Sequence, residues 1–168
     1  MNLAVYFVDS FTKKVFSGNA AGVVFHSGEL TATTMQNIAF ENNLSETAFI
    51  DTNKGNEIKF YSPEVEVDLC GHATLASAFV YFNFISEEAN EIIFNSNRGQ
   101  LVAKRKDDAI VMSLPKDQPK RESDLDIFVD ALGCDVHETY KGIDDYLAIV
   151  ENEEAVKNLI PDIDKIAK

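Results

Sequence analysis

Short hydrophobic runs rich in β-branched and aromatic residues follow one another through the first part of the chain. Runs of this kind predict strands, particularly where hydrophobic and polar positions alternate. The runs are separated by clusters of Gly, Asn, Asp and Lys, which are typical of tight turns. We therefore expect strands at residues 3–8, 21–25, 46–51, 57–61, 91–95, 100–105 and 109–114.

Two segments depart from the strand pattern. Residues 31–43 place Met35, Ile38 and Ala39 at helical spacing, which predicts an amphipathic surface helix. Residues 72–84 carry no charged side chain and are apolar or small on nearly every face, so a helix there has to be buried on all sides. Strands around one uncharged helix indicate a barrel-like half-shell with the helix at its centre.

The composition changes after residue 114. Residues 115–126 are polar and contain Pro115 and Pro119, which favours a linker. Beyond it, the pattern predicts helices at 127–132 and 153–159 and a strand at 146–150. These elements are too few to enclose a core of their own. We expect a first domain at residues 1–114 and the start of a second, incomplete domain at residues 127–168.

The charge balance excludes several classes of partner. Fifteen basic and 28 acidic residues give a formal net charge of −13, which repels nucleic acid and anionic membrane surfaces. No apolar run reaches the roughly 18–20 residues that span a bilayer, and no signal-type segment opens the chain. We expect a cytoplasmic protein in which Cys70 and Cys134 are reduced thiols.

Polar residues that a plain core does not explain gather in residues 16–23, 43–49 and 66–74. The last segment places Cys70, Gly71 and His72 where a strand-like run gives way to the buried helix. The backbone N–H groups of Gly71, His72 and Ala73 are then free at the helix start and able to hold an anion. The sequence therefore predicts a carboxylate ligand at this turn.

Glu46 is the candidate acid/base. Leu44, Ala48 and Phe49 flank it at the start of a strand, so its carboxyl group is partly desolvated if it points inward. Desolvation favours the protonated form, which suits a group that takes and returns a proton. The alternative is a solvated Glu at a strand edge, and the spacing by itself favours that alternative.

His72 and Cys70 each have two interpretations. His72 is either a hydrogen-bond donor to a substrate or a helix-start residue satisfied by nearby backbone. Cys70 is either a thiolate base, because a helix N-terminus favours a thiolate, or a small buried hydrophobic residue, which is the commoner case. A metal site needs three or four ligands, and Cys70 with His72 is the only close pair, so the sequence predicts no metal.

These segments resemble the PhzF-like family of the diaminopimelate epimerase superfamily. Family members show a Gly-Asn-Pro-Ala-Ala-Val turn, an Asn-Leu-Ser-Glu-Thr-Ala-Phe strand and a Glu-Val-Asp-Leu-Cys-Gly-His-Ala-Thr helix start. Two of the three segments match here almost letter for letter. Ala20 stands where Pro is usual, and Gly22 where Ala is usual. The resemblance extends from Val8 to about Leu114.

The resemblance implies an α+β fold of two similar halves. Each half is a diaminopimelate epimerase-like, mostly antiparallel curved sheet around a central helix, and the active site lies between them without metal or organic cofactor. It implies an isomerase that moves a proton in a small cyclic or amino-acid-like carboxylate, as the phenazine-pathway member does. By this resemblance Glu46 is the acid/base, and the substrate-binding residues are Gly71, His72, Asn19, Ser45 and Cys70.

Family members also have a second half with an acidic substrate-site residue and a Gly-Ser-Ala-His-like turn. Neither occurs before Lys168, so we expect this chain to lack the second half of the site. One alternative is an amino-acid racemase or epimerase that uses Cys70 with a second thiol, although Cys134 lacks a matching glycine-rich turn. Another is a catalytically silent half-domain that binds a carboxylate or associates with another chain, for example as a homodimer.

Overall fold

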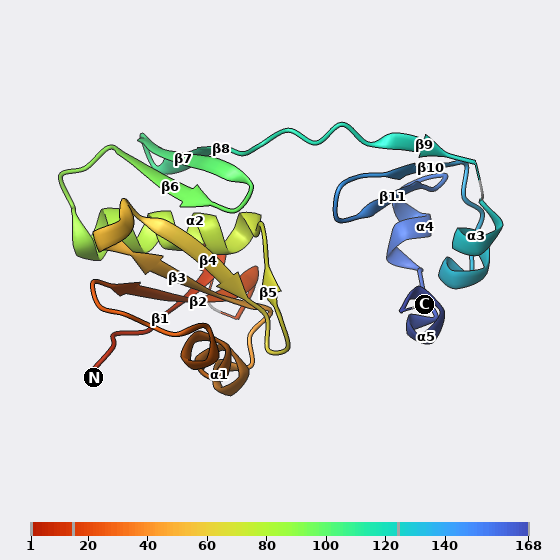
Figure 1. Ribbon diagram of the computed structural model, residues 1–168. Helices are drawn as coiled ribbons and strands as arrows, with labels where there is room; N and C mark the ends of the chain where they lie inside the picture. Colours follow the sequence, from red (N-terminus) through yellow and green to blue (C-terminus); the bar gives the residue numbers. More distant parts are fainter. Residues whose placement is uncertain (1, 15, 124, 168) are drawn as a thin grey trace. The chain divides into compact units, whose positions relative to one another are not determined.

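The computed structural model describes residues 2–14, 16–123 and 125–167. The chain divides into two compact units, Met1–Pro115 and Lys116–Lys168 (Figure 1).

The first unit is built on one eight-stranded sheet. Neighbouring strands are antiparallel, except that β2 runs parallel to β3 and β4 runs parallel to β6. Strand β5 pairs with β4 beside the main path. In sheet order the strands of that path are β1 (Tyr6–Ser10), β2 (Asn19–His26), β3 (Glu46–Asp51), β4 (Glu57–Tyr61), β6 (Glu91–Ser96), β7 (Gly99–Lys106) and β8 (Ala109–Ser113), and β5 is Glu66–Val67.

Helix α2 (Gly71–Val80) lies inside the curl of this sheet, between β1–β4 and β6–β8 (Figure 1). Its buried positions are small residues and one Val, so the surrounding strands approach it closely. Around it pack bulky side chains with almost no exposure, among them Phe60, Phe82, Phe94 and Leu101. The predicted α+β class, with a curved sheet around a central buried helix, is confirmed.

The ends of the central helix differ from the prediction. The helix begins at Gly71, and a π-helical turn over Tyr81–Ile85 replaces regular helix at its end. Three aromatic residues of the predicted segment, Tyr81, Phe82 and Phe84, fall in this turn, whereas Phe79 lies in α2 and is exposed, so the helix is not buried on every side. Here the Phe82 ring is buried against the core, while Phe84 is exposed.

Helix α1 (Ala32–Asn42) covers the outer face of the sheet (Figure 1). The Thr31 side chain accepts a hydrogen bond from the Thr34 amide and caps its start, and Asn43 ends it in the left-handed conformation. Met35 and Ala39 pack in a second core cluster with Val24, Phe49 and Tyr61. The predicted amphipathic surface helix is therefore present.

The hairpin of β1 and β2 depends on Gly18. Its φ angle is +78°, and a Cβ atom there would lie 2.1 Å from the carbonyl oxygen of Ser10. No other residue type fits so close a backbone approach. This turn fixes the register in which Ser10 pairs with Asn19 at the end of the hairpin.

The second unit contains a three-stranded antiparallel sheet and three short helices. Part of the segment 115–126, expected to be a linker, forms strand β9 and pairs with β10. Its sequence, Lys-Arg-Glu, has no hydrophobic alternation, so only backbone pairing reveals it. The elements are β9 (Lys120–Glu122), α3 (Asp126–Leu132), β10 (Glu138–Lys141), β11 (Tyr146–Ile149), α4 (Glu153–Lys157) and α5 (Ile163–Ile166). Among the described residues of either unit, no helix has the length and hydrophobicity needed to cross a bilayer.

Candidate active site

The start of β3 and the start of α2 meet at one end of the first unit's sheet. Strands β2 and β3 are parallel, with Ala21 paired to Glu46, so both strands begin at this end. The hydroxyl of Ser10 on β1 donates to the carbonyl oxygen of His72 at 2.8 Å. The hydroxyl of Thr74 donates to the carbonyl oxygen of Cys70 at 2.6 Å. These two bonds fix the first turn of α2 against the strand ends.

Glu46 points toward the Cys-Gly-His turn. Its Oε2 lies 3.3 Å from Nε2 of His72, and the side chains of Glu46 and His72 are 22% and 10% exposed. A carboxylate in this position is partly desolvated and has a specific partner. The geometry differs from that of a solvated Glu at a strand edge.

The other ring nitrogen of His72 faces a thiol. Nδ1 of His72 lies 3.2 Å from Sγ of Cys70. A neutral imidazole has one donor nitrogen and one acceptor nitrogen. These contacts suit a ring that carries its proton on Nε2, with the Cys70 S–H donating to Nδ1 and the Nε2–H beside the Ser45 hydroxyl and the Glu46 carboxylate. A hydrogen bond thus joins Cys70 to His72, and the Glu46 carboxylate lies at ion-pair distance from the same ring.

Cys70 is held as a neutral thiol. Burial raises the pKa of Cys70 to about 12, and the nearby negative charge of Glu46 adds to the shift. Hydrogen bonds to the sulfur from the backbone N–H groups of Ala73 and His72 oppose it only in part. At neutral pH the group is therefore a hydrogen-bond donor and a poor base, which argues against the racemase alternative. The same N–H groups were expected to hold a substrate anion, and in the structure they interact with this sulfur.

Asn19 and Ser45 complete the group of predicted residues. The Ser45 hydroxyl donates to Oδ1 of Asn19 at 3.1 Å and lies 3.4 Å from Nε2 of His72. Gly71 opens the helix, and a Cβ atom there would have only Leu114 near it, at 3.8 Å. The structure thus brings all six residues named from the sequence to one place.

Residues 8–168 match the family model PhzC-PhzF, which is described as "Phenazine biosynthesis-like protein". The chain belongs to this family. A Pseudomonas aeruginosa protein named an uncharacterized isomerase is 37% identical over 167 residues, which cover 99% of this chain and 64% of that protein. A cattle protein named for a phenazine biosynthesis-like domain is 40% identical over 124 residues, 68% of this chain and 43% of its own length.

Solved structures of PhzF relatives have the same fold. The PhzF family protein of Enterococcus faecalis superimposes with a TM-score of 0.84 at 39% identity, covering 98% of this chain and 64% of that one. A putative PhzC/PhzF protein of Clostridium difficile gives 0.82 at 36% identity, covering 99% and 64%. A predicted epimerase of Pseudomonas aeruginosa, at 17% identity and a TM-score of 0.77, shares the fold. The chain spans 64% of the length of the Enterococcus faecalis structure and 64% of the length of the Clostridium difficile structure.

One contact of this PhzF-family chain was not anticipated from the sequence. Nδ2 of Asn97 donates to Oδ1 of Asp68 at 3.0 Å, and Nε of Arg98 lies 3.7 Å from Oδ2 of the same carboxylate. The turn between β6 and β7 thereby holds the segment that leads into Cys70. Asp68 belongs to the family-like helix-start segment, but no sequence signal connects it to a turn so much later in the chain.

The donor atoms of Glu46, Cys70 and His72 all lie within 4.8 Å of one another. Cys70 and His72 are neighbours in the sequence, and the fold adds Glu46 as a third possible ligand. These three side chains are therefore able to surround a cation.

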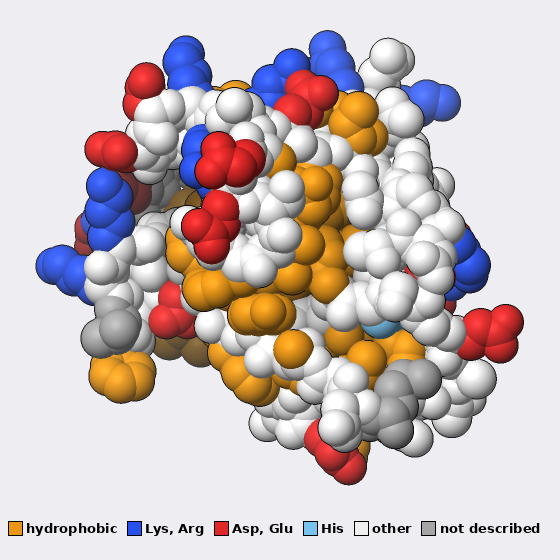
Figure 2. All heavy atoms as spheres, turned by 90° about the vertical axis from the view of Figure 1, so that its left-hand side faces the viewer, with side chains coloured by type: hydrophobic (Ala, Val, Ile, Leu, Met, Phe, Trp, Pro, Cys, Tyr) orange, Lys and Arg blue, Asp and Glu red, His pale blue; other side chains and the backbone are white. Residues whose placement is uncertain are grey.

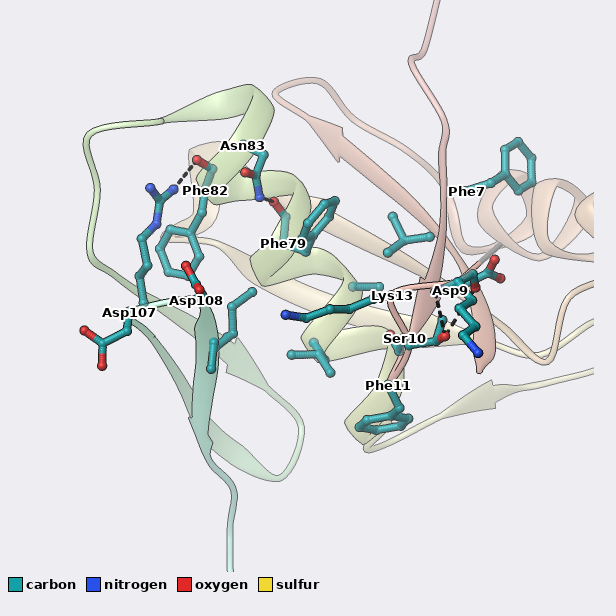
Figure 3. A pocket seen from close by; sticks show the side chains of 18 residues that line it. Phe7, Asp9, Ser10, Phe11, Lys13, Phe79, Phe82, Asn83, Asp107 and Asp108 are labelled. Atoms are coloured by element: carbon teal, nitrogen blue, oxygen red, sulfur yellow. Dashed lines mark hydrogen bonds between the residues drawn. The ribbon is translucent and has the colours of Figure 1, made fainter. Parts of the chain in front are cut away.

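A separate cavity of 720 Å³ opens between β1 and β8, the first and last strands of the sheet path, over the side of α2 (Figure 3). Phe79, Phe82 and Ile110 contribute hydrophobic walls, and Lys13 and Arg105 are among its charged lining residues. Glu46, Cys70 and His72 do not line it. This cavity is distinct from the candidate active site.

Proposed function

We propose that this chain supplies the acid/base half of a cofactor-independent, PhzF-like isomerase. The reaction moves a proton within a small cyclic or amino-acid-like carboxylate, with Glu46 as the acid/base. The observation that carries the proposal is the partly buried Glu46 carboxylate, 3.3 Å from the imidazole of His72 at the start of α2. The relatives named as isomerases support the same class of reaction.

The chemistry follows from the position of the Glu46 carboxylate beside the His72 imidazole. Glu46, as a carboxylate, takes a proton from a carbon of the substrate and becomes neutral, and the electron pair delocalises toward the substrate's unsaturated or carboxyl group. Glu46 then returns the proton to a different carbon, so that the substrate isomerises without net loss of a proton.

His72 is the residue whose hydrogen bonding can change when the substrate binds. With the Cys70 thiol donating to Nδ1, the Nε2–H of His72 is available to donate to Glu46 or to a substrate oxygen. In the proposal, the Gly71–His72 turn, with Ser45 and Asn19 beside it, binds the substrate carboxylate. Cys70 acts as a positioning residue that fixes the imidazole.

The experiment compares Glu46→Gln with Glu64→Gln, which changes an exposed loop residue in the same way. Both variants are made in the protein as it exists, and turnover of a trans-2,3-dihydro-3-hydroxyanthranilate-like compound is followed in D2O. Loss of a general acid/base costs about 10²–10⁴-fold in rate. We expect that loss, together with loss of deuterium incorporation, for Glu46→Gln only. Measurable turnover at the parent rate by both variants would exclude Glu46 as the base.

A second proposed function is association with another copy of the chain. Figure 2 shows hydrophobic side chains gathered in a band on one face of the first unit. Phe79 and Phe84, whose ring centroids lie 6.3 Å apart, are 42% and 58% exposed, and Phe11 is 69% exposed, an unusual exposure for large aromatic residues. Sedimentation velocity tests the proposal: a concentration-dependent dimer that Phe11→Ser and Phe84→Ser weaken supports it, and a strict monomer contradicts it.

A further inference from the structure

Three unlike donor groups converge at the start of α2. Glu46 offers a carboxylate oxygen, Cys70 a sulfur and His72 a ring nitrogen, and these atoms lie within 4.8 Å of one another. They come from two elements, β3 and the first turn of α2, that the core packs together. Cys70 is buried, whereas the Glu46 side chain is still partly open to solvent. Small ions from solution can therefore reach the cluster.

We propose that Glu46, Cys70 and His72 form a binding site for Zn²⁺, which takes sulfur, imidazole nitrogen and carboxylate oxygen in tetrahedral sites. Three protein ligands leave the fourth position to water. Binding forms a Zn–S bond, and the thiol proton of Cys70 leaves to solvent. The site takes a borderline-soft ion, because Mg²⁺ and Ca²⁺ prefer oxygen ligands and gain little from a sulfur.

The side chains have to reorient before all three bind one ion. With Zn–S of about 2.3 Å and Zn–N and Zn–O of about 2.0–2.2 Å, tetrahedral ligand atoms lie roughly 3.3–3.8 Å apart. Nε2 of His72 now faces Glu46 and Nδ1 faces Cys70, so the imidazole must present one nitrogen to the ion while Glu46, the most exposed of the three side chains, turns toward Cys70. The hydrogen bonds from Ser10 and Thr74 to the carbonyl groups of His72 and Cys70 hold the backbone of the other two ligands in place.

Zinc at this site opposes catalysis by the same residues. A carboxylate bound to Zn²⁺ is not available to take a proton, and a ligating imidazole no longer donates to Glu46 or to a substrate. The bound ion is thus an inhibitor of the proposed isomerase. The binding site itself stands independently of that function, since it depends only on the three donor atoms.

The test uses the metal alone and needs no turnover. Metal-free chain is titrated with Co²⁺, whose thiolate complexes give an intense ultraviolet charge-transfer absorption, and Zn²⁺ is then added as a competitor. We expect one equivalent of Co²⁺ to produce this absorption and one equivalent of Zn²⁺ to remove it. The matched control is Cys134→Ser, since Cys134 is the other cysteine of the chain and lies in the second unit.

The variants separate this site from adventitious binding. Cys70→Ser is expected to abolish the absorption, and Glu46→Gln and His72→Gln to weaken Co²⁺ binding by more than about tenfold, a loss that even outer-shell changes at metal sites cause. Cys134→Ser is expected to bind like the parent chain. Circular dichroism and thermal unfolding of each variant establish that it is folded. No charge-transfer absorption from the parent chain, or absorption that survives Cys70→Ser, would overturn the proposal.

Discussion

Nε2 of His72 lies 3.3 Å from Oε2 of Glu46, and this contact joins the first turn of the central helix to the start of β3. The two residues come from separate family-like segments, and each has a further partner. Ser45 adjoins Glu46 in sequence and approaches the same ring nitrogen, while Cys70 contacts the opposite side of the imidazole. The ring is therefore fixed from both sides.

The first prediction concerns the tautomer of this ring. Because the Glu46 carboxylate only accepts, neutral His72 is expected to carry its proton on Nε2. Nitrogen-15 NMR measures this directly. His26 is an internal control with the opposite expectation, since its Nδ1 lies 2.8 Å from the carbonyl oxygen of Gly28 and has to donate. A His72 ring protonated at Nδ1 would contradict donation from the Cys70 thiol to this nitrogen.

Thiol reactivity gives the second prediction. With burial raising the pKa of Cys70 to about 12, only about 10⁻⁴ of this thiol is ionised near pH 8. Alkylation by iodoacetamide, read by peptide mass spectrometry, is expected to label the partly exposed Cys134 first and Cys70 at least about 100-fold more slowly. In denaturant the two rates should become similar. Equal rates in the folded chain would show that Cys70 is neither buried nor electrostatically suppressed.

A loss of stability at alkaline pH is the third prediction. Burial raises the pKa of Tyr61 above its ordinary range, and its hydrogen bond to Glu66 and the negative charge of that residue add to this; the pKa of Cys70 is raised as well. The unfolded chain therefore loses these protons first, and the free energy of unfolding falls as the pH rises above about 9. Below that pH the contribution is fully present.

Urea unfolding measured from about pH 8 to about pH 11 follows the effect. Tyr61→Phe removes the hydroxyl that donates to Glu66 at 2.9 Å, and is expected to cost about 1 kcal/mol at neutral pH and to flatten the alkaline decline. An unchanged slope in Tyr61→Phe would mean that Tyr61 does not contribute to the decline.

The fourth prediction concerns Gly22, which stands where the family usually has Ala. A Cβ atom at this position would lie 2.9 Å from Oγ1 of Thr47 and 3.1 Å from Nδ2 of Asn42, which are hydrogen-bonded to each other. Gly22→Ala is expected to lower the free energy of unfolding by about 1–3 kcal/mol, as overpacking does.

Gly71→Ala is the matched control, because its new Cβ would meet only Leu114, at 3.8 Å. Alanine is the better helix former by up to about 1 kcal/mol, so this variant should be neutral or slightly stabilised. Thermal unfolding compares the two. If Gly22→Ala were as stable as the parent chain, the Thr47–Asn42 pair would have room to move.

The fifth prediction concerns the hold of the β6–β7 turn on Asp68. Asp68→Ala removes the acceptor of the Asn97 side chain and the partner of Arg98. The Asp68 side chain is 51% exposed, so the global stability should change by less than about 1 kcal/mol. Local opening is a different matter: amide hydrogen exchange in the first turn of α2 is expected to become faster. The control variant Glu87→Ala changes an exposed loop residue and should leave that exchange unchanged. If Asp68→Ala also left the exchange unchanged, the contact would have no positioning role.

Much of the first unit could be predicted from local patterns. The hydrophobic run at 57–61 is strand β4 to the residue, and the uncharged segment after His72 is the buried helix. The spacing of hydrophobic side chains and the absence of charge are properties of neighbouring residues, so they can be read directly from the sequence. Strand β9 and the two-residue β5 could not be found in this way, because they are too short to show a side-chain pattern and only their backbone pairing with β10 and β4 defines them.

The same distinction between local pattern and tertiary structure applies to the candidate active site. The sequence by itself singled out Glu46, Cys70 and His72 as candidates, because they stand in polar segments that match the family's segments almost letter for letter. Only the tertiary structure decided what surrounds each of them: that Cys70 is a neutral thiol, that His72 bridges it to Glu46, and that three donors meet at one point. The physical reason is that desolvation, hydrogen bonding and coordination depend on distances in space, and packing of β3 against α2 sets those distances.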